Sequence, residues 1–319
     1  MDYIKAESYN MSTITEQRVQ NFAEADDAIL EVKEELVNLE RKMSFYLKHS
    51  EISKLNESSG NKSLKVSDDT FKVIQKSIEY SKLTNGVFDI TLAPVIAEWG
   101  IFSENEKIPE ENRLNKLIGL VGYQDILLNK EQHTIFLKRE GQKVDLGGIA
   151  KGYATDQAIE IYKKHGIKSA MINLGGNVAV LGKKTDNTPW VIGIQNPDME
   201  RGEMVCSVSC EDISIVTSGN YVRNFEAAGE VYGHILSTTT GKPIKNSFLS
   251  VTVICKSGIK ADALSTAIFL MGLDEAIEFI NINNDIGAIL ITDCKEVYVS
   301  RNLKEKFHII DGDFEYYYC

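Results

Sequence analysis

The sequence predicts a globular protein in which helices and sheets are mixed. Apolar residues recur at three- and four-residue steps over residues 21–45 and 68–84, which is typical of amphipathic helices. Short apolar runs bounded by turn signals at residues 170–177 and 251–255 instead indicate strands. The chain has 319 residues, of which 43% are hydrophobic and 25% charged, enough for one large domain or two smaller ones.

The formal net charge of -11 narrows the range of partners. The phosphates of nucleic acid and an anionic membrane surface repel an acidic chain, so neither is expected as a partner. A phosphorylated ligand would need a divalent cation or local hydrogen-bond donors to offset the same repulsion.

Of the five cysteines, only Cys206 and Cys210 are close in sequence, with no other cysteine or histidine nearby. This spacing favours buried free thiols over a zinc site.

Residues 1–10 are polar and lack the apolar core of a secretory signal, and no run in the chain is as long as a membrane span. We therefore expect a cytoplasmic protein; an export or lipoprotein signal removed beforehand is the alternative. Residues 11–19 alternate between polar and apolar, which predicts an edge strand. The two amphipathic helices follow, separated by a polar loop and a short helix near residues 50–56.

Two residues next to these helices have two interpretations each. Tyr46 could stack on a flat ligand ring, or it could cap the core as an aromatic. Asp89 follows the turn signal Asn85-Gly86 and lies among apolar residues. Its carboxylate either caps a nearby backbone end or accepts N–H donors from a heterocyclic ligand, and the residues alone favour the cap.

The motif around which the chain is organised occupies residues 144–153, after a hairpin predicted at residues 126–137. Val144 and Leu146 predict the end of a strand, two glycines predict a tight turn, and a 3.6-residue period predicts a helix over residues 149–164. Backbone N–H groups at such a helix start can bind phosphate. Lys151 opposes the helix dipole there, so it is either a solvated lysine or the partner of a bound anion.

The second half of the chain continues with further strands and two helices. Strands are predicted at residues 170–177, 178–181, 190–195, 205–216, 232–236, 251–255, 287–291 and 297–300, and helices at residues 261–272 and 274–282. Residues 178–181 and 190–195 are expected to continue the sheet that begins at residues 170–177. His234 lies on a short strand before a hydroxyl-rich turn that ends in glycine. A single histidine is more often a satisfied core or surface group than a catalyst, and this position strengthens the case for a chemical role only somewhat.

Asp262 and Thr266 are four residues apart on the predicted helix 261–272, so they share one face. A carboxylate and a hydroxyl on an otherwise apolar helix can supply two oxygen ligands to Mg²⁺. The alternative is a first-turn aspartate favoured by the helix dipole, with a threonine bonded back to the preceding turn. The residues alone slightly favour this alternative.

Six blocks occur in an order and spacing that resemble the ApbE family, the FAD:protein FMN transferases. They lie at residues 86–91, 145–152, 173–177, 217–221, 234–241 and 261–266, and the resemblance extends from Met11 to about Ser300. It implies an α+β fold of T-fold-like mixed sheets packed with helices, with FAD in a cleft between them. It also implies a single domain over residues 1–319, in which residues 1–10 are flexible.

The resemblance further implies three sets of site residues. The residues expected to line the flavin or adenine part of FAD are Met11, Tyr46, Val87, Phe88 and Asp89. Those expected to contact the ligand further along are Asp145, Lys151, His234 and Ile235. Those expected to hold Mg²⁺ at the pyrophosphate are Gly148 through its backbone, Asp262, Ser265 and Thr266. His234 and Asp262 would be the catalytic residues.

The implied reaction moves FMN from FAD to a threonine hydroxyl of a partner redox protein and releases AMP. Such transfer depends mostly on positioning and charge neutralisation. Mg²⁺ on Asp262 and Thr266 would supply these, helped by backbone N–H groups near Gly147 and Gly148. His234 is the best candidate base for the acceptor hydroxyl, because imidazole commonly titrates near neutral pH.

Two departures from the family pattern and two other activities bear on this interpretation. Ser237-Thr238 stands where the family usually has Asp-Pro, which predicts a less rigid turn. Ser265 stands where some members have an aspartate, which predicts a weaker metal ligand.

The same site could serve an Mg-dependent FAD pyrophosphatase that yields FMN and AMP, or an FAD-binding protein without catalysis. A modified acceptor would indicate the transferase, whereas intact FAD beside Mg²⁺ and acceptor would indicate the binding protein.

Overall fold

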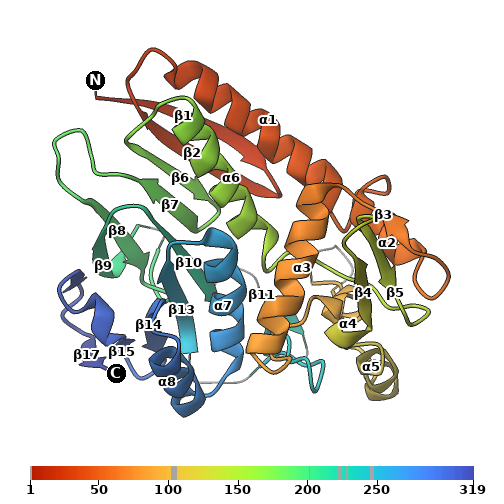
Figure 1. The fold of residues 1–319 in the computed structure, drawn as a ribbon. Coiled ribbons are helices and arrows are strands. Elements are labelled where there is room, and N and C mark those ends of the chain that lie inside the picture. The colour runs from red at the N-terminus through yellow and green to blue at the C-terminus, as the bar shows by residue number, and fades with distance from the viewer. Residues whose placement is uncertain (1, 102–105, 201, 221–223, 228, 245–247) are drawn as a thin grey trace. The chain divides into compact units, whose positions relative to one another are not determined.

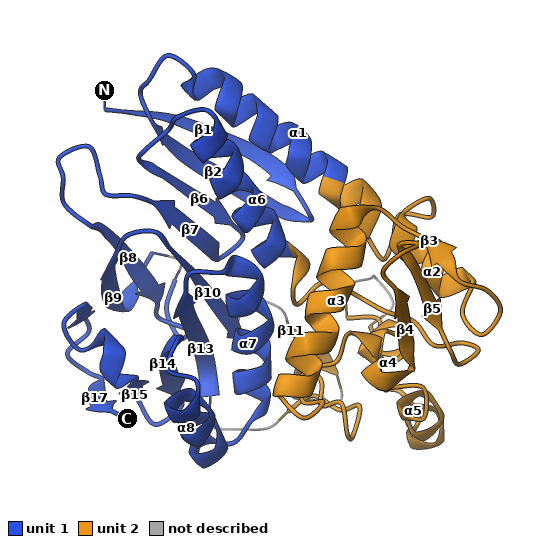
Figure 2. Cartoon of the chain, viewed as in Figure 1, with its two compact units in different colours: residues 1–38, 151–219, 247–319 blue, residues 39–150, 220–246 orange. Residues whose placement is uncertain are grey.

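A computed structural model of the chain describes residues 2–101, 106–200, 202–220, 224–227, 229–244 and 248–319. Tyr221, the last residue of the block at residues 217–221, lies outside them. The chain divides into two compact units (Figure 2). Unit 1 comprises Met1–Asn38, Lys151–Gly219 and Ser247–Cys319, and unit 2 comprises Leu39–Ala150 and Asn220–Asn246.

Unit 1 is built on a nine-stranded sheet with the order β1-β2-β6-β7-β10-β13-β14-β15-β17 (Figure 1). All neighbours in it are antiparallel except β15 and β17. Its strands are β1 Tyr3–Asn10, β2 Thr13–Gln20, β6 Ala170–Leu174, β7 Asn177–Leu181, β10 Ile213–Gly219, β13 Phe248–Cys255, β14 Gly287–Thr292, β15 Glu296–Val299 and β17 Glu315–Tyr318. A second sheet has the order β16-β9-β8, formed by β8 Trp190–Gln195, β9 Met204–Cys210 and β16 Phe307–Ile309.

Helices lie along the large sheet. They are α1 Ala25–Met43, which continues into unit 2 at Leu39, α6 Ala150–Lys164, α7 Gly258–Leu270, α8 Leu273–Ile282 and the 3-10 turn η3 Arg301–Leu303. Figure 1 shows α6 and α7 lying over one face of the sheet, and α7 packs against β10 and β13. The central strands are therefore covered, and residues 251–255 of β13 are all buried.

One hydrophobic cluster of unit 1 contains residues of both sheets. Ile215 and Ile254 of the large sheet pack in one cluster with Val208 and Phe307 of the small sheet. Successive side chains of a strand point to opposite faces, so Val216, next to Ile215, faces the other side of the large sheet. Both faces of the central strands are thus buried in apolar surroundings.

Unit 2 is a smaller assembly of short elements. Its helices are α2 Glu51–Glu57, α3 Asp68–Leu83, α4 Ala93–Trp99 and α5 Glu111–Ile118, with 3-10 turns η1 Ile90–Leu92 and η2 Tyr123–Asp125. Its strands form the sheet β3-β5-β4, from β3 Leu64–Lys65, β5 Thr134–Leu137 and β4 Ile126–Asn129, and the hairpin of β11 Asn224–Ala227 and β12 Glu230–Gly233. Trp99, Leu114, Phe225 and Leu236 belong to one buried cluster of this unit.

The N-terminal predictions need correction. The flexible N-terminus expected at residues 1–10 is wrong, because Tyr3–Asn10 pairs with β2 along its whole length. The strand predicted at residues 11–19 runs over Thr13–Gln20 and lies between β1 and β6 rather than at an edge. β1 is the edge strand, and its polar alternation gives no apolar run from which the sequence could identify it.

Other elements match the prediction to different degrees. The amphipathic helices near residues 21–45 and 68–84 are confirmed as α1 and α3, and the hairpin at residues 126–137 is confirmed as β4 and β5. The expectation that residues 190–195 continue the sheet of residues 170–181 is wrong, because β8 belongs to the second sheet, where it pairs with β9. Local alternation predicts a strand but does not specify its partner.

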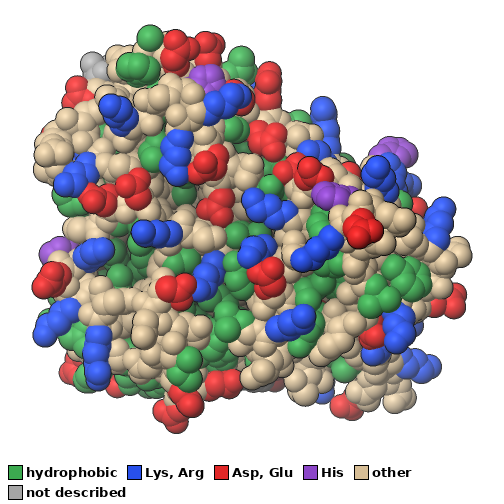
Figure 3. Space-filling model, viewed as in Figure 1, with side chains coloured by type: hydrophobic (Ala, Val, Ile, Leu, Met, Phe, Trp, Pro, Cys, Tyr) green, Lys and Arg blue, Asp and Glu red, His purple; other side chains and the backbone are tan. Residues whose placement is uncertain are grey.

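The surface and the thiols agree with the composition. Figure 3 shows acidic and basic side chains interspersed over the face in view. Cys206 and Cys210 are buried free thiols as predicted, and burial raises the pKa of both to about 12. Among the described residues, no helix combines the length and the apolar character that crossing a bilayer requires.

Candidate functional site

Asp262 is a buried carboxylate on the second turn of α7. The helix begins at Gly258, not at the predicted Ala261, so Asp262 is not a first-turn residue and that part of the alternative interpretation is wrong. Only 3% of Asp262 is exposed. Its Oδ2 accepts a hydrogen bond of 2.8 Å from the backbone N–H of Gly152, at the start of α6. The carboxylate therefore joins two helices whose residues are far apart in sequence.

Three hydroxyl groups gather beside Asp262 in unit 1. Ser218, on β10, places its Oγ 2.8 Å from Ser265 Oγ and 3.2 Å from Thr266 Oγ1. The Ser265 hydroxyl donates to the Asp262 backbone carbonyl at 2.9 Å, so Ser265 makes the bond back to the preceding turn that was expected of Thr266. The sequence motif at residues 217–221 contains Ser218, yet its spacing alone does not place this hydroxyl against α7.

This donor set suits Mg²⁺. It offers one carboxylate and several hydroxyl oxygens. The described residues contain no cluster of three or more His, Cys, Asp or Glu side chains that could bind a metal ion by themselves. Mg²⁺ is commonly bound by one or two carboxylates together with waters and substrate phosphates, rather than by a complete cage of protein ligands. Asp262, Ser265 and Thr266 thus fit an ion that takes its remaining ligands from a diphosphate.

The glycine-rich motif differs in part from its prediction. Residues 144–146 form no strand; instead the Asn56 side chain pairs with both backbone groups of Val144, at 2.8 and 3.0 Å, as a neighbouring strand would. Asp145 Oδ1 accepts the Gly147 N–H at 2.6 Å. This N–H is therefore engaged within the turn and was wrongly expected to be available to phosphate.

The conformation of Gly147 has a steric cause. A Cβ at this residue would lie 2.9 Å from Asp145 Oδ1, so the close approach of the carboxylate requires glycine. Gly148 is half-buried and precedes α6, which begins at Ala150 near the predicted start. Lys151 occupies the first turn of α6, where no acidic residue accompanies it. The interpretation of Lys151 as partner of an anion stays a prediction.

Asp89 acts as a cap, as the residues alone favoured. Its Oδ1 accepts from both the N–H and the hydroxyl of Thr91, at 2.8 and 2.7 Å, and its Oδ2 accepts from the Tyr123 N–H at 2.8 Å. The residue is 8% exposed. Burial raises the pKa of Asp89 above its usual range, against the opposite effect of these hydrogen bonds.

The other residues expected near the flavin or adenine differ in exposure. Phe88 is buried and Val87 is half-buried after the left-handed turn Asn85-Gly86. Tyr46 is 59% exposed, so the interpretation as a cap over the core is wrong, while stacking on a ligand ring stays a prediction. Its ring meets that of Phe45 edge-on, with centroids 5.3 Å apart.

Met11 has a strained backbone. Met11 and Ser12 form the two-residue turn between β1 and β2, with φ of 50° and 60°. Positive φ at both positions is typical of a hairpin turn that favours asparagine or glycine, and it is costly for a long side chain such as methionine. Strain of this kind is often retained at binding sites, which supports the predicted role of Met11.

His234 and Ile235 lie just beyond β12 rather than on the predicted strand, because β12 ends at Gly233. His234 is half-buried, and the Ile235 N–H donates to Asn220 Oδ1 at 3.3 Å. The Asn220 side chain lies so close to Gly233 that a Cβ there would be 2.2 Å from its Cγ. Asn220 therefore fixes the backbone on both sides of His234.

The turn after His234 keeps its caps despite the missing Asp-Pro. The Ser237 Oγ accepts from the N–H groups of Thr239 and Thr240, both at 3.2 Å. The Thr238 hydroxyl donates to the Gly86 carbonyl at 2.9 Å, which joins this turn to the one before Val87. Serine thus replaces the carboxylate as acceptor, and the expectation of a turn loosened by the loss of aspartate is not supported.

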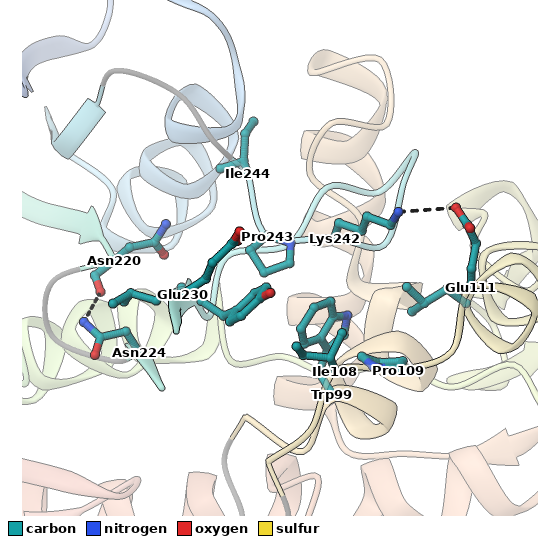
Figure 4. Close-up of a pocket in the computed structure, with 14 residues that line it drawn as sticks. Trp99, Ile108, Pro109, Glu111, Asn220, Asn224, Glu230, Lys242, Pro243 and Ile244 are labelled. Atoms are coloured by element: carbon teal, nitrogen blue, oxygen red, sulfur yellow. Dashed lines mark hydrogen bonds and ion pairs between the residues drawn. The ribbon is translucent and has the colours of Figure 1, made fainter. Parts of the chain in front are cut away.

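A cavity of about 540 Å³ adjoins this segment within unit 2 (Figure 4). Trp99, Ile108, Tyr232 and Pro243 form apolar parts of its lining. Trp99 is held by a 2.7 Å bond from its Nε1 to the Gly241 carbonyl. Gly233, the neighbour of His234, also lines it, whereas no residue predicted to contact FAD is in its lining.

The fold and the site together define an α+β protein with a buried carboxylate and hydroxyls suited to a metal and a phosphorylated ligand. The ApbE family model matches residues 11–290. The chain belongs to the ApbE family. Its fold is the α+β fold of that family, as the solved structures below indicate.

Named relatives and solved structures agree with this assignment. The chain is 32% identical to the FAD:protein FMN transferase of Vibrio cholerae over 83% of this chain and 78% of that protein. It is 34% identical to the FAD:protein FMN transferase of Haemophilus influenzae over 80% and 75% of the two chains. A crystal structure of the ApbE protein of Thermotoga maritima matches with a TM-score of 0.88 at 28% identity, covering 95% of this chain and 99% of that one. The flavin transferase ApbE of V. cholerae matches with a TM-score of 0.85 at 28% identity, covering 95% and 99%.

Proposed function

We propose that this chain is an Mg²⁺-dependent FAD:protein FMN transferase. It joins the FMN part of FAD to a threonine hydroxyl of a partner redox protein and releases AMP. Flavin transfer as the general activity rests on membership of the family and on the names of the relatives. The observation that carries the metal-dependent form is the buried Asp262 beside the hydroxyls of Ser265 and Thr266.

The reaction balances as a displacement at phosphorus. The acceptor threonine oxygen forms a bond to the FMN-side phosphorus, and the bond from that phosphorus to the bridging oxygen breaks with its electron pair on AMP. His234 takes the hydroxyl proton. Asp262, Ser265, Thr266 and the Gly148 backbone would hold Mg²⁺, which when bound supplies neutralisation of the diphosphate charge.

The remaining predicted residues bind and orient FAD in this proposal. Met11, Tyr46, Val87 and Phe88 contact the flavin or adenine, and Asp89 maintains the shape of the segment that carries Val87 and Phe88 through its bonds to Thr91 and Tyr123. Asp145, Lys151 and Ile235 contact the ligand further along. Lys151 adds positive charge to a chain whose net charge is -11, which favours an anionic ligand.

The deciding experiment is mass spectrometry of a candidate acceptor protein after incubation with this chain, FAD and Mg²⁺, with chromatography of the nucleotides. We expect the acceptor to gain one FMN through a phosphoester, one AMP to appear for each FMN attached, and an acceptor with its target threonine changed to valine to remain unmodified. FMN and AMP with an unmodified acceptor would indicate the pyrophosphatase. Intact FAD would indicate a binding protein.

The His234→Ala variant refines the same experiment. If His234 takes the acceptor proton, turnover should fall by about 10²–10⁴-fold while FAD affinity changes little, because a general base acts mainly in the transition state. Both constants are measured, the affinity by flavin fluorescence. Weakened FAD binding with normal turnover at saturation would remove His234 from the catalytic residues.

A further inference from the structure

Helices α6 and α7 touch through two glycines in unit 1. A Cβ at Gly152 would lie 2.2 Å from the Gly258 carbonyl oxygen, and a Cβ at Gly258 would lie 2.5 Å from the Gly152 carbonyl oxygen. Distances this short exclude any side chain at either position unless the helices move apart. The two backbones are therefore in direct contact at this crossing, and glycine is required on both sides.

Each helix carries an aspartate four residues after its glycine, and each aspartate bonds to the other helix. Asp262 of α7 accepts the Gly152 N–H at 2.8 Å. Asp156 of α6 accepts the Gly258 N–H at 2.6 Å and the Ile259 N–H at 3.1 Å. Residues four apart lie on one helix face, so the repeated pattern Gly-x-x-x-Asp produces a reciprocal pair of bonds. We call Gly152, Asp156, Gly258 and Asp262 the carboxylate clasp.

Asp156 fixes the start of α7. The first N–H groups of a helix have no partner within it, and Asp156 satisfies two of them with both carboxylate oxygens. The Ser257 hydroxyl, at the N-cap of α7, donates to the same carboxylate at 3.4 Å. A negative charge at this end of a helix is also favoured by the helix dipole. These bonds hold α7 against α6 at Gly258 and Ile259, about one helical turn before Asp262.

We infer that Asp156 is a positioning residue for the metal site, acting through Asp262. This inference rests on the proposed function, which assigns Asp262 to Mg²⁺ and gives Asp156 no role. Without the Asp156 half of the clasp, α7 can shift relative to α6, and the orientation that the Gly152 N–H gives to the Asp262 carboxylate is no longer enforced. Groups that orient a metal ligand commonly change metal affinity by about 10–100-fold when removed.

The test measures metal binding rather than activity alone. Mn²⁺ replaces Mg²⁺ as the probe, and free Mn²⁺ is followed by electron paramagnetic resonance in the presence of FAD. We expect Asp156→Ala to weaken Mn²⁺ binding by about tenfold or more, and Asp156→Asn by less because its amide oxygen keeps one acceptor. Turnover at saturating metal should stay within a few-fold of wild type, because the inference gives Asp156 no direct contact with substrate or metal.

A matched control and a double variant separate positioning from general destabilisation. Asp212, an exposed residue of the same unit, accepts the Gly182 N–H at 2.8 Å in a turn beside β10, so Asp212→Asn removes a carboxylate that bonds to backbone outside the clasp. It should leave Mn²⁺ affinity unchanged. Adding Asp156→Ala to Asp262→Asn should cause little further loss of affinity, because the effect of Asp156 passes through Asp262.

The outcomes are distinct. A wild-type protein that binds no Mn²⁺ with FAD would contradict the proposed metal site and this inference with it. If the wild type binds Mn²⁺ and the folded Asp156 variants bind it with the same affinity, the inference about Asp156 is overturned while the proposed metal site stands. Circular dichroism checks folding, and Ser257→Ala provides a milder variant that removes one contact to the Asp156 carboxylate. If the Asp156 variants do not fold, an unchanged Mn²⁺ affinity in Ser257→Ala overturns the inference, and a smaller loss in the same direction supports it.

Discussion

Asp89 uses both of its carboxylate oxygens to hold its turn. Its oxygens accept three hydrogen bonds from Thr91 and Tyr123, yet burial still raises its pKa. Asparagine or serine offers a single acceptor oxygen in its side chain, so either would leave one of these N–H groups without its bond. The two acceptor oxygens of Asp89 come at the cost of burying a charge. The observed cap therefore accounts for the carboxylate, and a ligand contact of Asp89 stays a prediction.

The pH dependence of stability should report this cost. Because the folded pKa of Asp89 is raised, the folded protein binds this proton more tightly than the unfolded chain does. The stability from this group is complete below the ordinary aspartate pKa and is lost as pH rises through the folded pKa. As pH rises above the ordinary aspartate pKa, wild type should therefore lose free energy of unfolding relative to Asp89→Asn, measured by urea denaturation. A difference between the two proteins that does not change with pH would contradict this.

Among the elements, the crossing of α6 and α7 unites motifs that are far apart in the sequence. It brings Gly152 of the glycine-rich motif against Gly258, and it brings Asp262 to the start of α6. The loop after β12 is likewise joined to a segment that is distant in sequence, because the Thr238 hydroxyl donates to the Gly86 carbonyl. In both cases one polar group from a distant segment fixes the backbone beside a predicted site residue.

A pair of glycine substitutions tests the crossing. Gly152→Ala places a Cβ 2.2 Å from the Gly258 carbonyl, so it should destabilise the protein by about 1–3 kcal/mol and weaken Mn²⁺ binding. Gly312→Ala is the control, because this exposed glycine has no left-handed φ and its Cβ would meet nothing within 4 Å. Its effect should stay within about 0.5 kcal/mol. Urea denaturation measures both, and a Gly152→Ala protein as stable as wild type would exclude the tight crossing.

At the scale of the whole molecule, the negative net charge opposes the binding of an anionic ligand. The chain carries a net charge of -11, and FAD carries a negative diphosphate. Within the described residues no cluster of three metal-binding side chains forms a complete cage. The metal and the diphosphate are therefore expected to bind together, because the diphosphate supplies oxygen ligands to the metal and the metal neutralises the charge of the diphosphate.

This coupling should appear in thermal unfolding. A ligand that binds only the folded state stabilises it according to its concentration relative to its Kd, by about 2.7 kcal/mol at 100 times Kd. FAD should therefore raise Tm more with Mg²⁺ than with EDTA, and FMN should raise it less than FAD at the same concentration. Differential scanning fluorimetry measures the shifts. Equal shifts for FAD with and without metal would contradict a shared metal–diphosphate site.

The sequence by itself determined the features that depend on local spacing. The 3.6-residue period located α1, α3 and α6, two short strand-like runs located the β4–β5 hairpin, and the four-residue step placed Asp262 and Thr266 on one helix face. These predictions succeed because helix and strand periodicity act over a few neighbouring residues. The order of the blocks then sufficed to indicate the family.

Tertiary structure alone decided the contacts between segments. Only the fold brought Ser218 against Ser265, Asn56 to Val144, and Asp156 to Gly258. It also gave β1 its partner and β8 its separate sheet. A polar side chain such as Asn56 gives no sign in its own neighbourhood of the distant backbone group that it will satisfy. Such pairings follow from the packing of the whole core, which sets each register and brings buried polar groups to their partners.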